Sequence, residues 1–120
     1  MRKKIIFSVI AAILLLTNAA FAATSSATIT STMTGADGAT YSMTNYVDNS
    51  GQNYASSTNT LWVELYISVD GPDQRFSGSL MAVNGSASWR DTVPTGNYYI
   101  HLDPDGPLYT GCNGWGKALD

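Results

Sequence analysis

The feature that most constrains the fold is a strict alternation of side chains over residues 61–69. The odd positions are apolar and the even positions are aromatic or polar: Leu61, Val63, Leu65, Ile67 and Val69 alternate with Trp62, Glu64, Tyr66 and Ser68. Successive side chains of a β-strand point to opposite faces of the sheet, so this segment predicts a strand with one dry face. Turn-forming residues over 70–73 end the strand.

The most specific turn signal is Asn84-Gly85, which favours a two-residue type I′ turn. It predicts a hairpin over residues 75–93 in which Val83 faces Ser86. One face of this hairpin then carries the apolar side chains Phe76, Leu80, Ala82, Ala87, Trp89 and Val93. A shift by one residue would scramble that division, so the turn and the pattern support each other.

A second hairpin is expected over residues 97–113, where alternating segments flank a turn rich in Asp, Pro and Gly. In its expected register Leu102 faces Leu108 and Tyr98 faces Cys112. This register keeps the thiol of Cys112 away from the one histidine of the chain.

A weaker pair of strands is expected over residues 27–34 and 39–47, and residues 48–60 are expected to form a loop. Roughly seven short strands with turns every 8–12 residues predict an all-β fold. We therefore expect a single small antiparallel β-sandwich, immunoglobulin-like or related, of about seven strands. Residues 95–102 resemble a strand opening found in exported immunoglobulin-like and transthyretin-like sandwiches.

The N-terminal residues predict a secretory signal peptide. Basic residues at the start precede an apolar run over 5–16, and the small residues Ala20 and Ala22 precede the expected cleavage site. Residues 1–22 are thus expected to form a signal peptide helix that is removed, which leaves one domain over 23–120. The apolar run of about 12 residues is too short to span a bilayer. We expect a secreted or periplasmic bacterial protein with no transmembrane segment after cleavage.

Removal of the signal peptide makes the chain more acidic. The whole chain carries six basic and nine acidic residues. Three basic residues leave with the signal, so Arg75, Arg90 and Lys117 remain against nine acids and the net charge becomes −6. Nucleic acids and anionic membranes require a basic protein surface, so this charge argues against both as partners.

Cys112 is the one cysteine of the chain, so no disulfide can form within it. Two alternatives stay open for this residue. It is either a small buried side chain, as free cysteines often are, or an exposed thiol that forms an intermolecular disulfide and links two copies into a dimer.

The even positions of the first strand suggest a ligand-binding face. Trp62 and Tyr66 flank Glu64 there, and aromatic rings beside a carboxylate can stack on sugar rings and accept hydrogen bonds from their hydroxyl groups. Tyr99 and His101 alternate along another strand and extend this surface. The alternative is that this face packs under a loop or a second layer, where aromatic cross-strand pairs are common.

The sequence shows no coherent catalytic set. His101 and Asp103 share a strand face, but no nucleophile motif accompanies them, so a Ser-His-Asp triad lacks support. Residues 103–106 begin like a calcium loop, but Pro107 and Gly114 occupy positions that need ligands. We expect no enzymatic activity, no cofactor and no metal site.

These observations predict an exported, non-catalytic binding or interaction protein whose partner is a carbohydrate, a cell surface or another protein. The alternative is a small secreted toxin or bacteriocin-like effector, in which the strands over 27–47 rearrange into a membrane hairpin. Leakage of dye from liposomes distinguishes the second hypothesis from the first.

Overall fold

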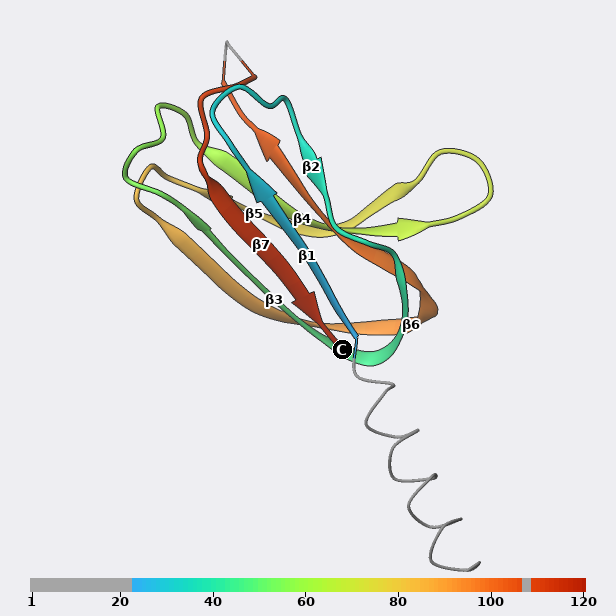
Figure 1. Cartoon of the computed structure of the whole chain (residues 1–120). Coiled ribbons are helices and arrows are strands. Elements are labelled where there is room, and N and C mark those ends of the chain that lie inside the picture. Colours follow the sequence, from blue (N-terminus) through green and yellow to red (C-terminus); the bar gives the residue numbers. More distant parts are fainter. Residues whose placement is uncertain (1–22, 107–108) are drawn as a thin grey trace, which may run out of the picture.

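The computed structural model describes residues 23–106 and 109–120, and all the regular structure in these residues is β-strand (Figure 1). The strands are β1 (Thr24–Ile29), β2 (Ala36–Asp37), β3 (Tyr41–Asn53), β4 (Leu61–Ser68), β5 (Gln74–Met81), β6 (Ser86–Pro104) and β7 (Gly114–Leu119). The predicted all-β class is confirmed. No helix in the described part of the chain is long and apolar enough to cross a membrane. The predicted signal peptide, residues 1–22, lies outside the described residues.

Hydrogen bonds join all seven strands into one antiparallel sheet in the order β1-β7-β3-β6-β4-β5, with β2 beside β6. The long strand β6 is shared, because residues 86–98 pair with β3 and residues 97–104 pair with β4. We call β1, β7, β3 and the first half of β6 the β7 layer. The second half of β6 forms the β4 layer together with β2, β4 and β5.

The two layers pack face to face. Figure 1 shows β6 curving from one layer into the other. Gly116 of β7 lies against the side chains of Val63 in β4 and Leu102 in β6. The layers thus cover a common core while belonging to one continuous sheet, and the immunoglobulin-like subtype stays a prediction.

One extra residue in β6 reverses which of its side chains point inward. β3 has the single residue Thr44 where β6 has two, Pro94 and Thr95. Such a bulge shifts the alternation of the strand by one position. Val93 before the bulge and Tyr98 after it are both buried, although five positions separate them. The outer face of the β4 layer then receives Tyr99, His101 and Asp103.

The core lies between the two layers, and the odd positions of β4 face it as predicted until Val69, which lies beyond the end of the strand and is exposed. The buried apolar residues come from both layers: Ala27, Ile29, Met43, Val47, Leu61, Val63, Leu65, Met81, Val93, Tyr98, Ile100, Leu102, Cys112 and Ala118. The inward residues of β7 are small, namely Gly114, Gly116 and Ala118, which allows the layers to approach closely there.

The predicted hairpin over residues 75–93 is wrong in its pairing, because β5 pairs with β4. The short connection over 69–73 brings β5 back beside the strand that precedes it. The expected faces of β5 are also reversed, since Met81 is buried while Leu80 and Phe76 are exposed. In β6 the inward positions agree with the prediction: Ala87, Trp89 and Val93.

The turn at Asn84 is present, but its geometry and its role differ from the prediction. The amide of Gly85 donates to the carbonyl of Ala82 over 2.8 Å, and Asn84 adopts a φ of 64°. Gly85 does not adopt a positive φ, whereas a type I′ turn at these two residues needs it at both. The chain passes here from the β4 layer to the β7 layer.

The other two predicted pairings are also wrong. β1 pairs with β7 instead of β3, and residues 48–53, expected in a loop, continue β3. The second half of β6 pairs with β4 and β2, so Tyr98 does not face Cys112. Leu108, the expected partner of Leu102 in that hairpin, lies outside the described residues. Local alternation identifies strands, but partners that lie far apart in sequence are chosen by the packing of the whole chain.

Candidate functional site

The outer face of the β4 layer brings together all five residues proposed from the sequence. The register places Glu64 opposite His101 and Tyr66 opposite Tyr99, with Trp62 on the same face of β4. Glu64 is buried, and the other four side chains are half-buried and reach the surface. We call this surface the β4 face, and its members are Asp37, Trp62, Glu64, Tyr66, Arg75, Tyr99, His101 and Asp103.

Three rings of the β4 face contact one another. Tyr66 and Tyr99 are stacked, with ring centroids 5.7 Å apart and an angle of 24° between the planes. The ring of His101 meets Tyr66 edge-on at 5.1 Å. The hydroxyl of Tyr99 donates to Asp73 Oδ2 over 2.8 Å, and burial and this bond raise the pKa of Tyr99. These contacts hold the three rings in place on the outer surface of the sheet.

A second bulge brings Arg75 to this face. Between the pairs made by Leu65 and Tyr66, β5 carries the extra residue Phe76, so that Arg75 lies opposite Tyr66. Arg75 Nε then lies 2.9 Å from Glu64 Oε2. Sequence analysis missed this role of Arg75, because a plain alternation along β5 cannot reveal a bulge.

Arg75 also covers an aromatic ring and needs a glycine beside it. Its guanidinium carbon lies 4.7 Å from the ring centroid of Trp62, a cation–π contact. Gly78, opposite Glu64 in the register, leaves the necessary space, because a methyl group there would overlap the guanidinium. The conjunction of a glycine and an arginine in one strand is the only sequence signal for this arrangement.

Glu64, His101 and Asp103 form a compact cluster at the centre of the β4 face. Their ligand-type atoms, one from each side chain, all lie within 4.8 Å of one another. Nδ1 of His101 hydrogen-bonds to Asp37 Oδ1 from β2. Burial raises the pKa of Glu64, an effect that the charges of Arg75 and His101 partly oppose.

Cys112 takes no part in the β4 face. Its side chain is fully buried, and its thiol donates to the backbone carbonyls of Asn59 and Thr60 at 3.4 and 3.3 Å. Burial raises the pKa of this thiol. The structure thus agrees with the alternative in which Cys112 is buried. An intermolecular disulfide would require this segment to open.

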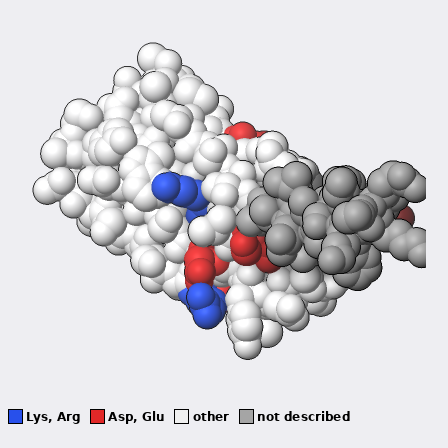
Figure 2. Space-filling view, turned by 60° about the horizontal axis from the view of Figure 1, so that its bottom comes forward, with Lys and Arg blue, Asp and Glu red and all other residues white. Residues whose placement is uncertain are grey.

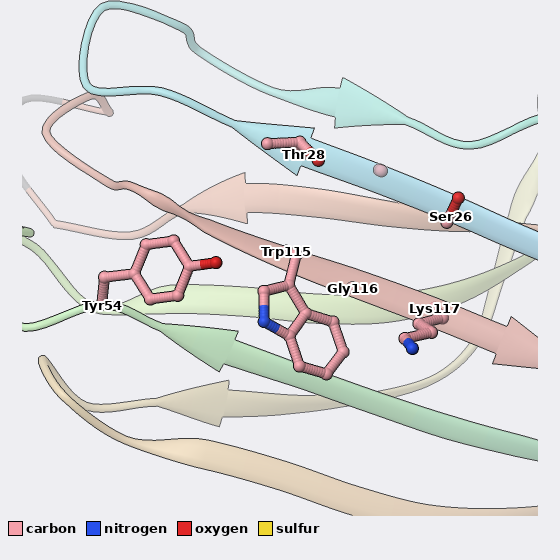
Figure 3. Close-up of a pocket in the computed structure, with 7 residues that line it drawn as sticks. Ser26, Thr28, Tyr54, Trp115, Gly116 and Lys117 are labelled. Atoms are coloured by element: carbon pink, nitrogen blue, oxygen red, sulfur yellow. The ribbon is translucent and has the colours of Figure 1, made fainter.

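A second candidate surface lies on the outer side of the β7 layer (Figure 3). It is a shallow depression of about 360 Å³, lined by Ser26, Ala27, Thr28, Tyr54, Trp115, Gly116 and Lys117. In Figure 3 the rings of Tyr54 and Trp115 lie side by side in it. Lys117 Nζ lies 5.1 Å from the Trp115 ring. Residues 114–119 lie beyond the strands expected from the sequence, although they alternate between small and larger side chains.

Charged groups are sparse on the surface shown in Figure 2, where basic and acidic side chains stand among uncharged ones. Where the β3 and β6 strands pair, Arg90 holds Asp48 through two hydrogen bonds of 2.7 and 3.1 Å. That exposed pair lowers the pKa of Asp48. The buried carboxylate of Glu64 therefore differs in kind from the exposed one of Asp48.

Comparison with known proteins identifies no family. No protein-family model and no curated protein matches the chain. Among solved structures the chain is similar to the Yersinia pseudotuberculosis-derived mitogen, with a TM-score of 0.41 and 12% identity over 82% of this chain and 83% of that chain. A likeness of this degree assigns no function to the residues described above.

Proposed function

We propose that the chain is an exported, non-catalytic binding protein that takes an extended carbohydrate on the β4 face. The observation on which this proposal rests is the row of half-buried rings that reach the surface beside carboxylates on one strand pair. The stacked pair Tyr66–Tyr99 lies at one end and Trp62 at the other, with Glu64 between them.

The spacing of the rings favours an oligosaccharide over a single sugar. Trp62 and Tyr66 lie four positions apart in β4, which corresponds to about 13 Å along a strand. Ring faces offer flat apolar area for the C–H faces of sugars, and carboxylates accept hydrogen bonds from hydroxyl groups. Asp103, opposite Trp62, adds a second carboxylate at that end.

The position of the one thiol supports a binding role over a catalytic one. The contacts of Arg75 with Oε2 of Glu64 and of Asp37 with Nδ1 of His101 orient these two side chains. The thiol of Cys112, the strongest nucleophile by residue type, is buried away from the surface.

Binding of soluble oligosaccharides, followed by intrinsic tryptophan fluorescence, tests this proposal. The panel contains hexasaccharides of glucose, xylose and N-acetylglucosamine. We expect Trp62→Ala to weaken binding at least about tenfold, or about 1.4 kcal/mol. The matched control Trp115→Ala alters the other outer surface and should bind as the wild type does.

Loss of binding in Trp115→Ala with no effect of Trp62→Ala would place the ligand on the β7 layer and contradict the proposal. New reducing ends during incubation would contradict its non-catalytic part, because glycoside hydrolysis needs only two suitably spaced carboxyl groups. Far-ultraviolet circular dichroism confirms that both variants are folded.

A further inference from the structure

We propose that Glu64, His101 and Asp103 bind a divalent transition metal ion, with zinc the best match. The sequence predicts no metal site, because these residues come from two strands and their spacing shows no metal motif. The structure juxtaposes them, since Glu64 is the cross-strand partner of His101 and Asp103 follows two positions later on the same face.

The separations suit three ligands of one ion. The candidate ligand atoms lie within 4.8 Å of one another. A tetrahedral zinc ion with bonds of about 2.0–2.1 Å holds its ligand atoms roughly 3.3 Å apart. Rotations of the side chains on a fixed pair of strands can close this difference. Three protein ligands leave a fourth position for water or for another ligand.

An unpaired carboxylate oxygen is the independent observation that points to a ligand. Glu64 is only 6% exposed. Its Oε2 is bound by Arg75, but its Oε1 is buried and has no hydrogen-bond partner among residues 23–106 and 109–120. A buried, unpaired oxygen of this kind is costly, and a metal bond at Oε1 would remove that cost.

Two groups next to the cluster, Asp37 and Arg75, orient its candidate ligands. Asp37 hydrogen-bonds to Nδ1 of His101, which leaves Nε2 of the ring for a metal. A carboxylate behind a metal-binding histidine holds the ring and increases its basicity. Arg75 likewise holds Oε2 of Glu64 and leaves Oε1 available.

The local charge also favours a divalent cation. The carboxylates of Asp37, Glu64 and Asp103 lie around the imidazole of His101, which binds a metal in its neutral form, and Arg75 is paired with Glu64. Three negative groups and one positive group leave an excess of negative charge, which a divalent cation offsets. One imidazole with two carboxylates suits zinc better than calcium or magnesium, which prefer sites made of oxygen ligands alone.

The histidine makes the test specific, because His101 is the only one in the chain. The purified protein is titrated with zinc chloride while the imidazole signals are followed by NMR, and affinity and stoichiometry are measured by calorimetry. We expect one zinc ion per chain, a shift of the His101 signals and a higher melting temperature. Calcium and magnesium chloride should bind at least about tenfold more weakly.

Variants separate the ligands from their surroundings. Asp103→Asn should weaken zinc binding more than Asp37→Asn, for which a loss of about 10–100-fold is expected because Asp37 only orients His101. Asp48→Asn, which alters the β3–β6 ion pair, is the control and should bind zinc as the wild type does. Glu64→Gln removes a ligand, but it also breaks a buried ion pair, so Asp103→Asn is the decisive variant.

Unmoved His101 signals at saturating zinc would overturn the proposal, as would equal affinity in the wild type and Asp103→Asn. Tighter binding of calcium than of zinc would overturn the choice of metal. The inference goes beyond carbohydrate binding and does not depend on it, because the metal alone is the probe. Saccharide titrations repeated in EDTA report on the proposed function separately.

Discussion

The two outer faces of the molecule are both formed by antiparallel strands, yet they present different chemistry. The β4 face concentrates an ion pair, a histidine and stacked rings around the buried carboxylate of Glu64. The outer face of the β7 layer carries hydroxyl groups around Trp115 and Lys117 in a shallow depression. The two faces thus differ in the residue types that they present.

The two faces also differ in the regularity of their strand pairing. β7 pairs with β1 and β3 without any shift in register, so simple alternation distributes its side chains. The β4 face depends on two bulges, one at Phe76 in β5 and one at Pro94 and Thr95 in β6. Each bulge turns side chains to the outside that strict alternation would turn inward. The bulge in β5 thus adds Arg75 to this face, and the bulge in β6 adds the outward side chains that follow it.

The largest expected effect comes from Leu102, which lies behind the β4 face and against Gly116 of β7. Leu102→Ala should lower the free energy of unfolding by about 2–5 kcal/mol, because it opens a cavity between the layers. Urea denaturation measures this loss. Leu80→Ala is the control, since Leu80 is 43% exposed on the outside. Equal losses in the two variants would contradict the described core.

A smaller loss of stability is expected when a methyl group is added at the contact between the layers. A methyl group at Gly116 would come within 2.9 Å of Leu102 and 3.1 Å of Val63. Gly116→Ala should therefore cost about 1–3 kcal/mol of stability. In the Leu102→Ala background the same change should cost less, because the cavity accepts the methyl group. Additive losses in urea denaturation would show that these residues do not meet.

The arrangement of Arg75 can be tested through Gly78. Gly78→Ala should displace the guanidinium from Glu64, because the added methyl group occupies its place. Arg75 lowers the pKa of Glu64, so its displacement should raise that pKa further. Carboxyl ¹³C NMR follows Glu64 without ambiguity, since it is the only glutamate. An unchanged titration would show that Arg75 does not depend on the glycine.

The carboxylates of Glu64 and Asp48 should change the stability of the fold in opposite directions as the pH rises. Burial raises the pKa of Glu64 above 4.5, so the folded state binds this proton more tightly than the unfolded state does. Its contribution to stability therefore falls as the pH rises from 4.5 through the folded pKa. Arg90 lowers the pKa of Asp48 below 3.8, so that contribution is present above 3.8 and is lost as the pH falls through the folded pKa.

Carboxyl ¹³C NMR from pH 2 to 8 checks both directions. Glu64 should titrate above its ordinary value and Asp48 below its own. A Glu64 that titrates below 4.5 would show a solvated carboxylate dominated by Arg75 and would remove the contrast between these two ion pairs.

The smallest effect concerns Cys112, on the segment that leads from β6 to β7. Its buried thiol should react slowly with a disulfide reagent in the folded protein and quickly in denaturant, because burial hinders access and raises the thiol pKa. Non-reducing gels of oxidised protein should show no dimer. Rapid reaction under native conditions would place the thiol at the surface.

The parts of the β4 face that the sequence predicted are those set by local alternation. Trp62, Glu64 and Tyr66 share a face because the odd positions of β4 are apolar, and this pattern needs no knowledge of the partner strands. Tyr99 and His101 alternate in the same way with buried Ile100. That these two segments pair could not be deduced, since no turn connects them directly.

The parts that the sequence did not predict depend on contacts between distant residues. Asn84-Gly85 favours a hairpin by itself. Because β5 pairs with β4, however, this segment connects the two layers. Residues 48–53 are polar and resemble a loop, yet they form strand because β7 and β6 pair with them on both sides. Arg75 reaches Glu64 only through a bulge, which no period-2 pattern signals.

Mapping of amide chemical shifts tests the central claim most directly, namely that ligand meets the β4 face. ¹H–¹⁵N spectra are recorded while hexasaccharides of glucose, xylose and N-acetylglucosamine are added in turn. We predict that at least one of them shifts signals of β4 and of the second half of β6, including Glu64, Tyr99 and His101. Shifts confined to β1 and β7 around Trp115, or no shift with any of the three, would contradict the account.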